Sequence, residues 1–140
     1  SSNLLQEARE LLVSTLANTS NYKDGLALYE SLPVRSENAM KIYPKLLYGR
    51  SVELINDQQI NQAEPLLNRL LEIPYNNNLV ALTRFWKGEI AYRNGNNEAA
   101  IQHFIEYIKN PVTNGEVNVV NARYSLGYAL LKTENYPAAK

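Results

Sequence analysis

The stretch that decides the fold runs from Phe85 to Pro111 and reads FWKGEIAYRNGNNEAAIQHFIEYIKNP. It places a glycine, Gly88, inside an apolar pattern with the 3.6-residue period of a helix, and the pattern then breaks at Gly-Asn-Asn. After the break, Ala100 and Phe104 are spaced by four residues, which puts both on one face of a second helix. The stretch therefore predicts two helices joined by a tight turn, with Pro111 ending the second helix.

The same landmarks recur along the chain. An alanine early in a second helix follows a glycine by 12 residues in two units. In a third unit the interval is 14 residues, and we expect the connector INDQQINQ (residues 55–62) to contain the two extra residues. Glycine destabilises a helix interior by about 1 kcal/mol, so its recurrence predicts a close contact between packed helices. The glycines are Gly49, Gly88 and Gly127, and the alanines are Ala63, Ala100 and Ala139.

Apolar periodicity and turn residues predict seven helices and the beginning of an eighth, with no strand. Pro44 marks either a late start or a kink of the third helix. The expected helix pairs span residues 3–33, 36–74, 77–111 and 116–140, and the last pair is incomplete because ENYPAAK only begins its second helix. We therefore expect an all-α protein that forms one domain over residues 1–140 and is a fragment of a longer protein.

The composition excludes several function classes. The 140 residues carry 14 basic and 14 acidic side chains, so the formal net charge is zero, whereas a domain that grips nucleic acid needs a basic excess. No apolar run approaches the roughly 20 residues of a membrane-spanning helix. We therefore expect neither nucleic-acid binding nor membrane insertion. The chain has no cysteine, which removes disulfide and thiolate chemistry.

The sequence contains no recognisable catalytic or cofactor motif. Ser-His-Asp, Cys-His and paired-carboxylate arrangements are absent, and the turn at residues 95–97 lacks the Gly-Lys-Ser/Thr of a phosphate loop. His103 is the only histidine. Because a metal site needs several ligands, we expect a surface helix residue there. Trp86 has helical spacing with Leu82 and Ile90, which favours the core over a binding anchor. We expect no enzymatic activity, no metal and no cofactor.

The pattern resembles the tetratricopeptide repeat, a family of helix pairs. The resemblance implies a right-handed α-solenoid of antiparallel helix pairs with about three and a half repeats. The spacing of 37–41 residues exceeds the family's usual 34, and Lys87 stands where a leucine is usual. A short similarity around Trp86 to repeats of bacterial envelope proteins favours a bacterial envelope location over the cytoplasm. The residues on family positions are Gly88, Tyr92, Gly95, Ala100, Phe104 and Pro111 in the first stretch, and Leu126, Gly127, Tyr136 and Ala139 in SLGYALLKTENYPAA.

The resemblance also implies that the first helix of each pair lines a concave groove. A row rich in tyrosine suits binding of a peptide or partner protein, because tyrosine combines a large ring with a hydroxyl; the alternative is that several of these rings pack between helices. Glu53 and Glu89 would repel a terminal carboxylate, which argues against a carboxylate clamp. The expected groove residues are Tyr43, Arg50, Glu53, Phe85, Glu89, Tyr92, Asn121, Tyr124 and Tyr128, with Leu46 and Leu131 in the same rows.

These expectations lead to two alternative functions. The first is a non-catalytic protein-interaction scaffold that binds a peptide or a partner protein in the groove. The second is a structural module that packs on the rest of a larger protein, or forms a homo-oligomer, through its incomplete C-terminal repeat. The second alternative predicts that the first helix of the last pair exposes its apolar side chains, namely Val119, Val120, Leu126 and Leu130.

Overall fold

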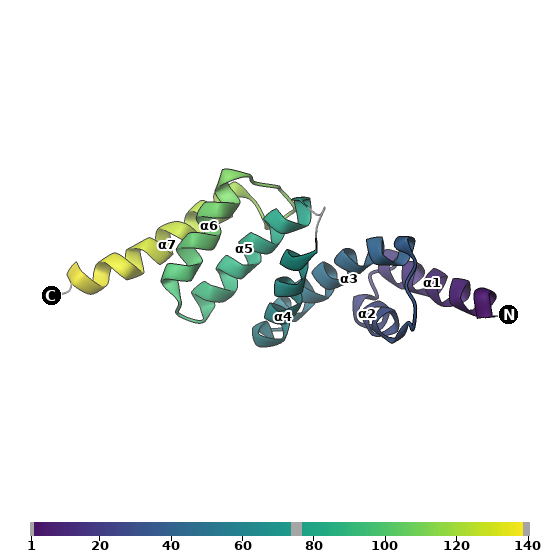
Figure 1. Cartoon of the computed structure of the whole chain (residues 1–140). Helices are drawn as coiled ribbons and strands as arrows, with labels where there is room; N and C mark the ends of the chain where they lie inside the picture. The colour runs from purple at the N-terminus through teal and green to yellow at the C-terminus, as the bar shows by residue number, and fades with distance from the viewer. Residues whose placement is uncertain (1, 74–76, 139–140) are drawn as a thin grey trace. The chain divides into compact units, whose positions relative to one another are not determined.

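The computed structural model describes residues 2–73 and 77–138, and these residues form helices, turns and one isolated bridge between Asn114 and Val117. The predicted all-α class is therefore confirmed for the described part of the chain. The helices, labelled in Figure 1, are α1 (Ser2–Asn18), α2 (Tyr22–Ser31), α3 (Glu37–Asn56), α4 (Ile60–Glu72), α5 (Asn77–Arg93), α6 (Asn97–Lys109) and α7 (Val119–Ala138).

The chain divides into two compact units, Ser1–Ile73 with α1 to α4 and Pro74–Lys140 with α5 to α7. In the first unit, α2 packs against α1 and α3, and α4 packs against α3. In the second unit, α6 packs against both α5 and α7. None of the described helices is both long enough and apolar enough to cross a membrane.

A turn of three residues joins the two helices of each of the first three pairs, at residues 19–21, 57–59 and 94–96. The amide of the last turn residue donates to the carbonyl five residues earlier, at 2.8 Å in all three turns. This bond defines the Schellman motif, which closes the C-terminal end of the first helix. The middle residue of each turn has the left-handed conformation that the motif requires, and these residues are Ser20 (φ 61°), Gln58 (φ 63°) and Gly95 (φ 79°).

Counting from the middle residue of each turn brings the three pairs into register. A small buried residue follows five positions later, and it is Gly25, Ala63 or Ala100. Larger buried residues follow nine and twelve positions after the turn residue, and they are Tyr29 and Leu32, Leu67 and Leu70, and Phe104 and Tyr107. The repeated unit is therefore a helix, a Schellman turn and a second helix that presents a small residue and then two bulky ones to the core.

This register corrects the predicted role of the connector between α3 and α4. The connector has three residues like the others, so the two extra residues do not lie there but within α3, between Gly49 and the turn. Two residues rotate a helical position by about 200°. Gly49 and Gly88 are therefore on nearly opposite faces of their helices, and the predicted equivalence of the glycines is wrong.

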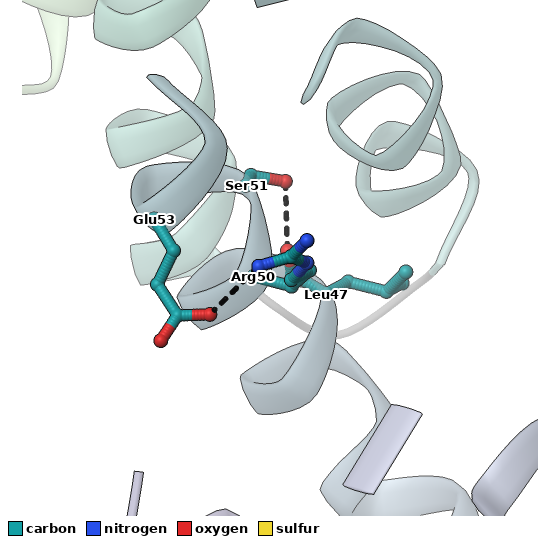
Figure 2. Close-up of polar contacts among 4 residues, drawn as sticks. All are labelled: Leu47, Arg50, Ser51 and Glu53. Atoms are coloured by element: carbon teal, nitrogen blue, oxygen red, sulfur yellow. Dashed lines mark hydrogen bonds and ion pairs between the residues drawn. The ribbon is translucent and has the colours of Figure 1, made fainter. Parts of the chain in front are cut away.

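The residue of α3 that is equivalent to Gly88 is Ser51, seven positions before the turn residue. Ser51 is fully buried, and its hydroxyl donates to the Leu47 carbonyl at 2.7 Å, as Figure 2 shows. Gly49 instead faces α2, where an added Cβ would lie 2.5 Å from the ring of Tyr22. Small side chains thus occupy the close contacts, but different residues supply them in different pairs.

The second unit has an aromatic core between α5 and α6. The ring of Phe85 meets Trp86, Phe104 and Tyr107 edge to face, with centroids 5.4, 5.8 and 5.5 Å away. Edge-to-face pairs of this kind stabilise a core beyond their buried area. The Tyr107 hydroxyl donates to the Val112 carbonyl at 2.7 Å, which satisfies the polar end of a buried side chain. Trp86 is a core residue, as its spacing predicts.

The helix α7 differs from the prediction, because it runs unbroken from Val119 to Ala138. The predicted start of a separate eighth helix in ENYPAAK is therefore wrong for the described residues. No residue of α7 has the left-handed conformation that ends α1, α3 and α5. Ala139, a predicted repeat position, lies outside the described residues. At the other end of α7, the side chain of Asn118 accepts from the Asn121 amide at 2.8 Å and caps the helix.

The start of α3 resolves the two alternatives for Pro44. The helix begins at Glu37, and the Ser36 side chain accepts from the Ala39 amide, which caps the first turn. The helix therefore starts early and continues through Pro44, which is buried. A late start at Pro44 is excluded.

Two glycines of the second unit give opposite predictions for substitution by alanine. An added Cβ at Gly88 would lie 2.8 Å from the Phe104 ring, which is fully buried and has no room to move, so Gly88→Ala should lower the free energy of unfolding by about 1–3 kcal/mol. At Gly127 nothing lies within 4 Å of an added Cβ among the described residues, so Gly127→Ala should raise it by about 0.5–1 kcal/mol.

The fluorescence of Trp86, the only tryptophan, reports on this unit during urea denaturation. Equal effects of the two substitutions would contradict the assignment of Gly88 to a tight helix contact.

Candidate functional site

Four of the predicted groove residues come together in the second unit. Glu89 and Tyr92 on α5, with Tyr124, Ser125 and Tyr128 on α7, line an open hollow of about 320 Å³. We call this site the tyrosine hollow. It joins residues that are more than 30 positions apart in the sequence, because α5 and α7 lie close enough for direct side-chain contact.

A hydrogen bond and an ion pair fix the position of Glu89. The Ser125 hydroxyl donates to one carboxylate oxygen of Glu89 at 2.9 Å, and Arg93 Nε lies 3.7 Å from the other oxygen. Hydrogen bonds to charged groups are stronger than those between neutral groups. Both oxygens of Glu89 are thus engaged within the protein, so this side chain holds α7 against α5 and is a positioning residue of the hollow.

The tyrosines of α7 form a pair at a spacing of four residues. Their ring centroids are 4.9 Å apart and their hydroxyl oxygens 3.3 Å apart. Tyr124 is 66% exposed and Tyr128 is 44% exposed, so most of this pair faces solvent. The hydrogen bond to Tyr128, and then the repulsion between the two phenolate charges, raise the pKa of Tyr124 above its ordinary value.

A cation lies beside these tyrosines. The Lys132 ammonium is 4.5 Å from the centroid of the Tyr92 ring, within the range of a cation–π contact. The prediction did not include Lys132, Ser125 or Arg93. Lys132 follows Tyr124 and Tyr128 in the same i, i+4 row of α7, and extending the row by one turn finds it.

Two other predicted residues of the second unit do not line the hollow. Phe85 is only 3% exposed and belongs to the aromatic core described above, so its predicted place in a groove is corrected. The Asn121 side chain donates to the Glu116 carbonyl at 2.8 Å and secures the loop before α7. Leu131 is exposed on α7 but is not among the lining residues.

In the first unit, Tyr43 packs between helices, which is the alternative that the sequence left open. Its ring stacks on Tyr29 of α2, with centroids 4.3 Å apart and an interplanar angle of 10°. The Arg35 guanidinium lies 4.7 Å from the Tyr29 centroid and Arg69 lies 5.9 Å from the Tyr43 centroid. These four side chains form a cation–π stack that links α2, α3 and α4, and burial raises the pKa of Tyr29.

Arg50 and Glu53 lie apart from Tyr43, near the start of α2. They form an ion pair of 3.3 Å, drawn as a dashed line in Figure 2. Both line an open polar hollow of about 500 Å³ together with Tyr22, Lys23 and Asp24. The charged side chains of this lining are two basic ones, Lys23 and Arg50, and three acidic ones, Asp24, Glu53 and Asp57.

The corrected register explains why these residues do not continue the row of the tyrosine hollow. The α3 positions equivalent to Glu89 and Tyr92 are Val52 and Ile55, because α3 carries two extra residues before its turn. Leu46, also in the predicted row, is fully buried and meets Gly25 of α2. The predicted row of α3 therefore faces α2 over part of its length.

Within residues 2–73 and 77–138 there is no group of three or more His, Asp or Glu side chains able to hold a metal ion. His103 lies half-buried on α6. Comparisons with protein-family models, curated proteins and solved structures found no significant match to this chain.

The tyrosine pair predicts a measurable change in proton affinity. Replacing Tyr128 with phenylalanine removes the hydroxyl that stabilises the neutral form of Tyr124, so the pKa of Tyr124 should fall toward its ordinary value. The titration is followed by NMR at ¹³C-labelled tyrosine Cζ. Tyr22→Phe, in the first unit, is the matched control and should leave the Tyr124 titration unchanged. An unaltered Tyr124 titration in Tyr128→Phe would show that the hydroxyl contact does not form in solution.

Proposed function

We propose that this chain is a non-catalytic protein-interaction scaffold of the tetratricopeptide-repeat type. Its helix pairs would then belong to a right-handed solenoid. Three pairs with the same Schellman turn and the same buried small and bulky positions support this proposal. The motif around Gly88 and Ala100 supports it further, because it has the family's residues at the family's spacing.

The observation that carries the proposed function is the tyrosine hollow. Tyr92, Tyr124 and Tyr128 offer large rings with hydroxyls, and tyrosine loses little conformational entropy on binding. The link from Ser125 to Glu89 holds the walls of the hollow in place before a ligand arrives. Such preorganisation lowers the free-energy cost of binding. A peptide or an exposed segment of a partner protein is the ligand that suits an open hollow of this kind.

Alanine substitutions in the hollow test the proposal. Peptides that bind the chain are first selected from a random peptide library, and their dissociation constants are then measured by fluorescence anisotropy. Tyr92→Ala and Tyr124→Ala should each weaken binding by about tenfold or more, since each removes a ring that the ligand covers. Leu130→Ala is the matched control, because Leu130 is exposed on α7 but does not line the hollow. Selected peptides that bind all variants equally would refute the hollow as the binding site.

A second candidate function is self-association through α7. The observation that favours it is the apolar surface of this helix, where Val120 is 76% exposed and Leu130 is 40% exposed. Val119 and Leu126, also expected on this surface, are only partly exposed. Exposed apolar patches on proteins often mark interaction sites. Under this candidate, α7 of one copy would cover α7 of another.

Sedimentation over a range of protein concentrations distinguishes this candidate from a monomeric scaffold. Self-association predicts that the average mass rises with concentration and that Val120→Glu abolishes the rise, because a buried unpaired carboxylate is strongly unfavourable. Gln62→Glu, an exposed substitution on α4, is the charge-matched control. A mass that stays monomeric throughout would exclude self-association as the role of α7.

A further inference from the structure

We propose that the tyrosine hollow binds a proline-rich segment in the polyproline II conformation, with an acidic residue beside the prolines. The proposal rests on the proposed function, since it specifies which peptide chemistry the hollow recognises. It follows from the lining side chains, from their spacing along α7 and from the charge of Lys132.

The architecture makes other common modes of peptide recognition unsuitable. Strand addition needs a free sheet edge, and the described residues form no strand. An amphipathic helix needs a continuous apolar trough. The lining residues of the hollow instead all have polar ends, because three are tyrosines and the others are Glu89 and Ser125.

Polyproline II chemistry matches this lining. The conformation has no internal hydrogen bonds, so its backbone carbonyls are free to accept from donors on a protein surface. The Tyr124 and Tyr128 hydroxyls hydrogen-bond to each other, so one of them donates within the pair and the other keeps its O–H for such a carbonyl. Both side chains are exposed. The flat rings of the same residues supply a surface against which pyrrolidine rings pack, as in other aromatic-lined grooves that bind proline-rich segments.

The spacing along α7 also matches. Residues four apart in an α-helix are separated by about 6 Å along its axis, which is the rise between Tyr124 and Tyr128 and again between Tyr128 and Lys132. Polyproline II has three residues per turn, so side chains three positions apart share a face and are separated by about 9.3 Å. The middle of the Tyr124–Tyr128 pair and Lys132 are separated by about 9 Å along the axis of α7. A segment that runs along α7 with a proline packed on the tyrosine pair therefore presents the residue three positions away to Lys132.

The charges of the hollow select the residue beside the prolines. The Glu89 carboxylate is already engaged by Ser125 and Arg93. Among the described side chains, Lys132 contacts the Tyr92 ring and forms no ion pair with a carboxylate. The cation at the rim is thus available to an acidic residue of the ligand, and such a contact between opposite charges is screened by salt.

The test uses a fluorescein-labelled probe peptide with a central run of prolines followed by one aspartate. Two matched peptides replace the prolines by alanine or the aspartate by asparagine. Fluorescence anisotropy with the full chain should show the proline peptide binding about tenfold more tightly than the alanine peptide. The aspartate should strengthen binding several-fold at low salt, and this gain should vanish in Lys132→Gln but persist in the control Arg123→Gln.

Variants of the tyrosines separate this proposal from the broader one. Tyr124→Ala should abolish binding of the proline peptide, and Tyr124→Phe with Tyr128→Phe should weaken it several-fold while circular dichroism shows intact helices. Equal binding of the proline and alanine peptides would overturn the polyproline proposal. If library-selected peptides without proline lose binding in Tyr124→Ala, the hollow is a peptide site with a different specificity. If no peptide responds to Tyr124→Ala, the proposed function fails as well.

Discussion

The close approach of two helices across a three-residue turn is the constraint on which the rest of the structure depends. A first helix that ends in a Schellman motif reverses direction at once, so the start of the second helix lies against the first. Only a small residue fits there, and Gly25, Ala63 and Ala100 occupy that position. The bulky side chains that follow in the second helix then fill the core.

The same constraint positions the tyrosine hollow. Phe104 packs under Gly88 and fixes α6 beside α5, and α6 in turn carries α7. Glu89 and Tyr92 of α5, one and four residues after Gly88, then face the side chains of α7. The hollow is therefore a product of helix packing and does not depend on a loop.

The sequence predicts the first seven helices and the landmark residues of the α5–α6 pair well, because apolar periodicity, capping residues and prolines are local signals. It did not reveal that Ser20 and Gln58 take the left-handed conformation, since neither is a glycine. Without those turns as markers, the sequence pattern aligns Gly49 with Gly88 and places the row of α3 two residues out of register. The pattern places Phe85 in a groove for a different reason: its burial depends on Tyr107 and Phe104, which lie on another helix.

The differing turn residues have a consequence for the order of folding. A residue with a Cβ in the left-handed conformation is destabilised by roughly 1–2 kcal/mol, whereas glycine is not. The turns at Ser20 and Gln58 therefore form at a local energetic disadvantage that the turn at Gly95 lacks. The hairpin of α5 and α6 also joins a favourable turn to an aromatic cluster with short sequence separation. Local contacts favour fast folding, so we expect this hairpin to form before α7 packs on it.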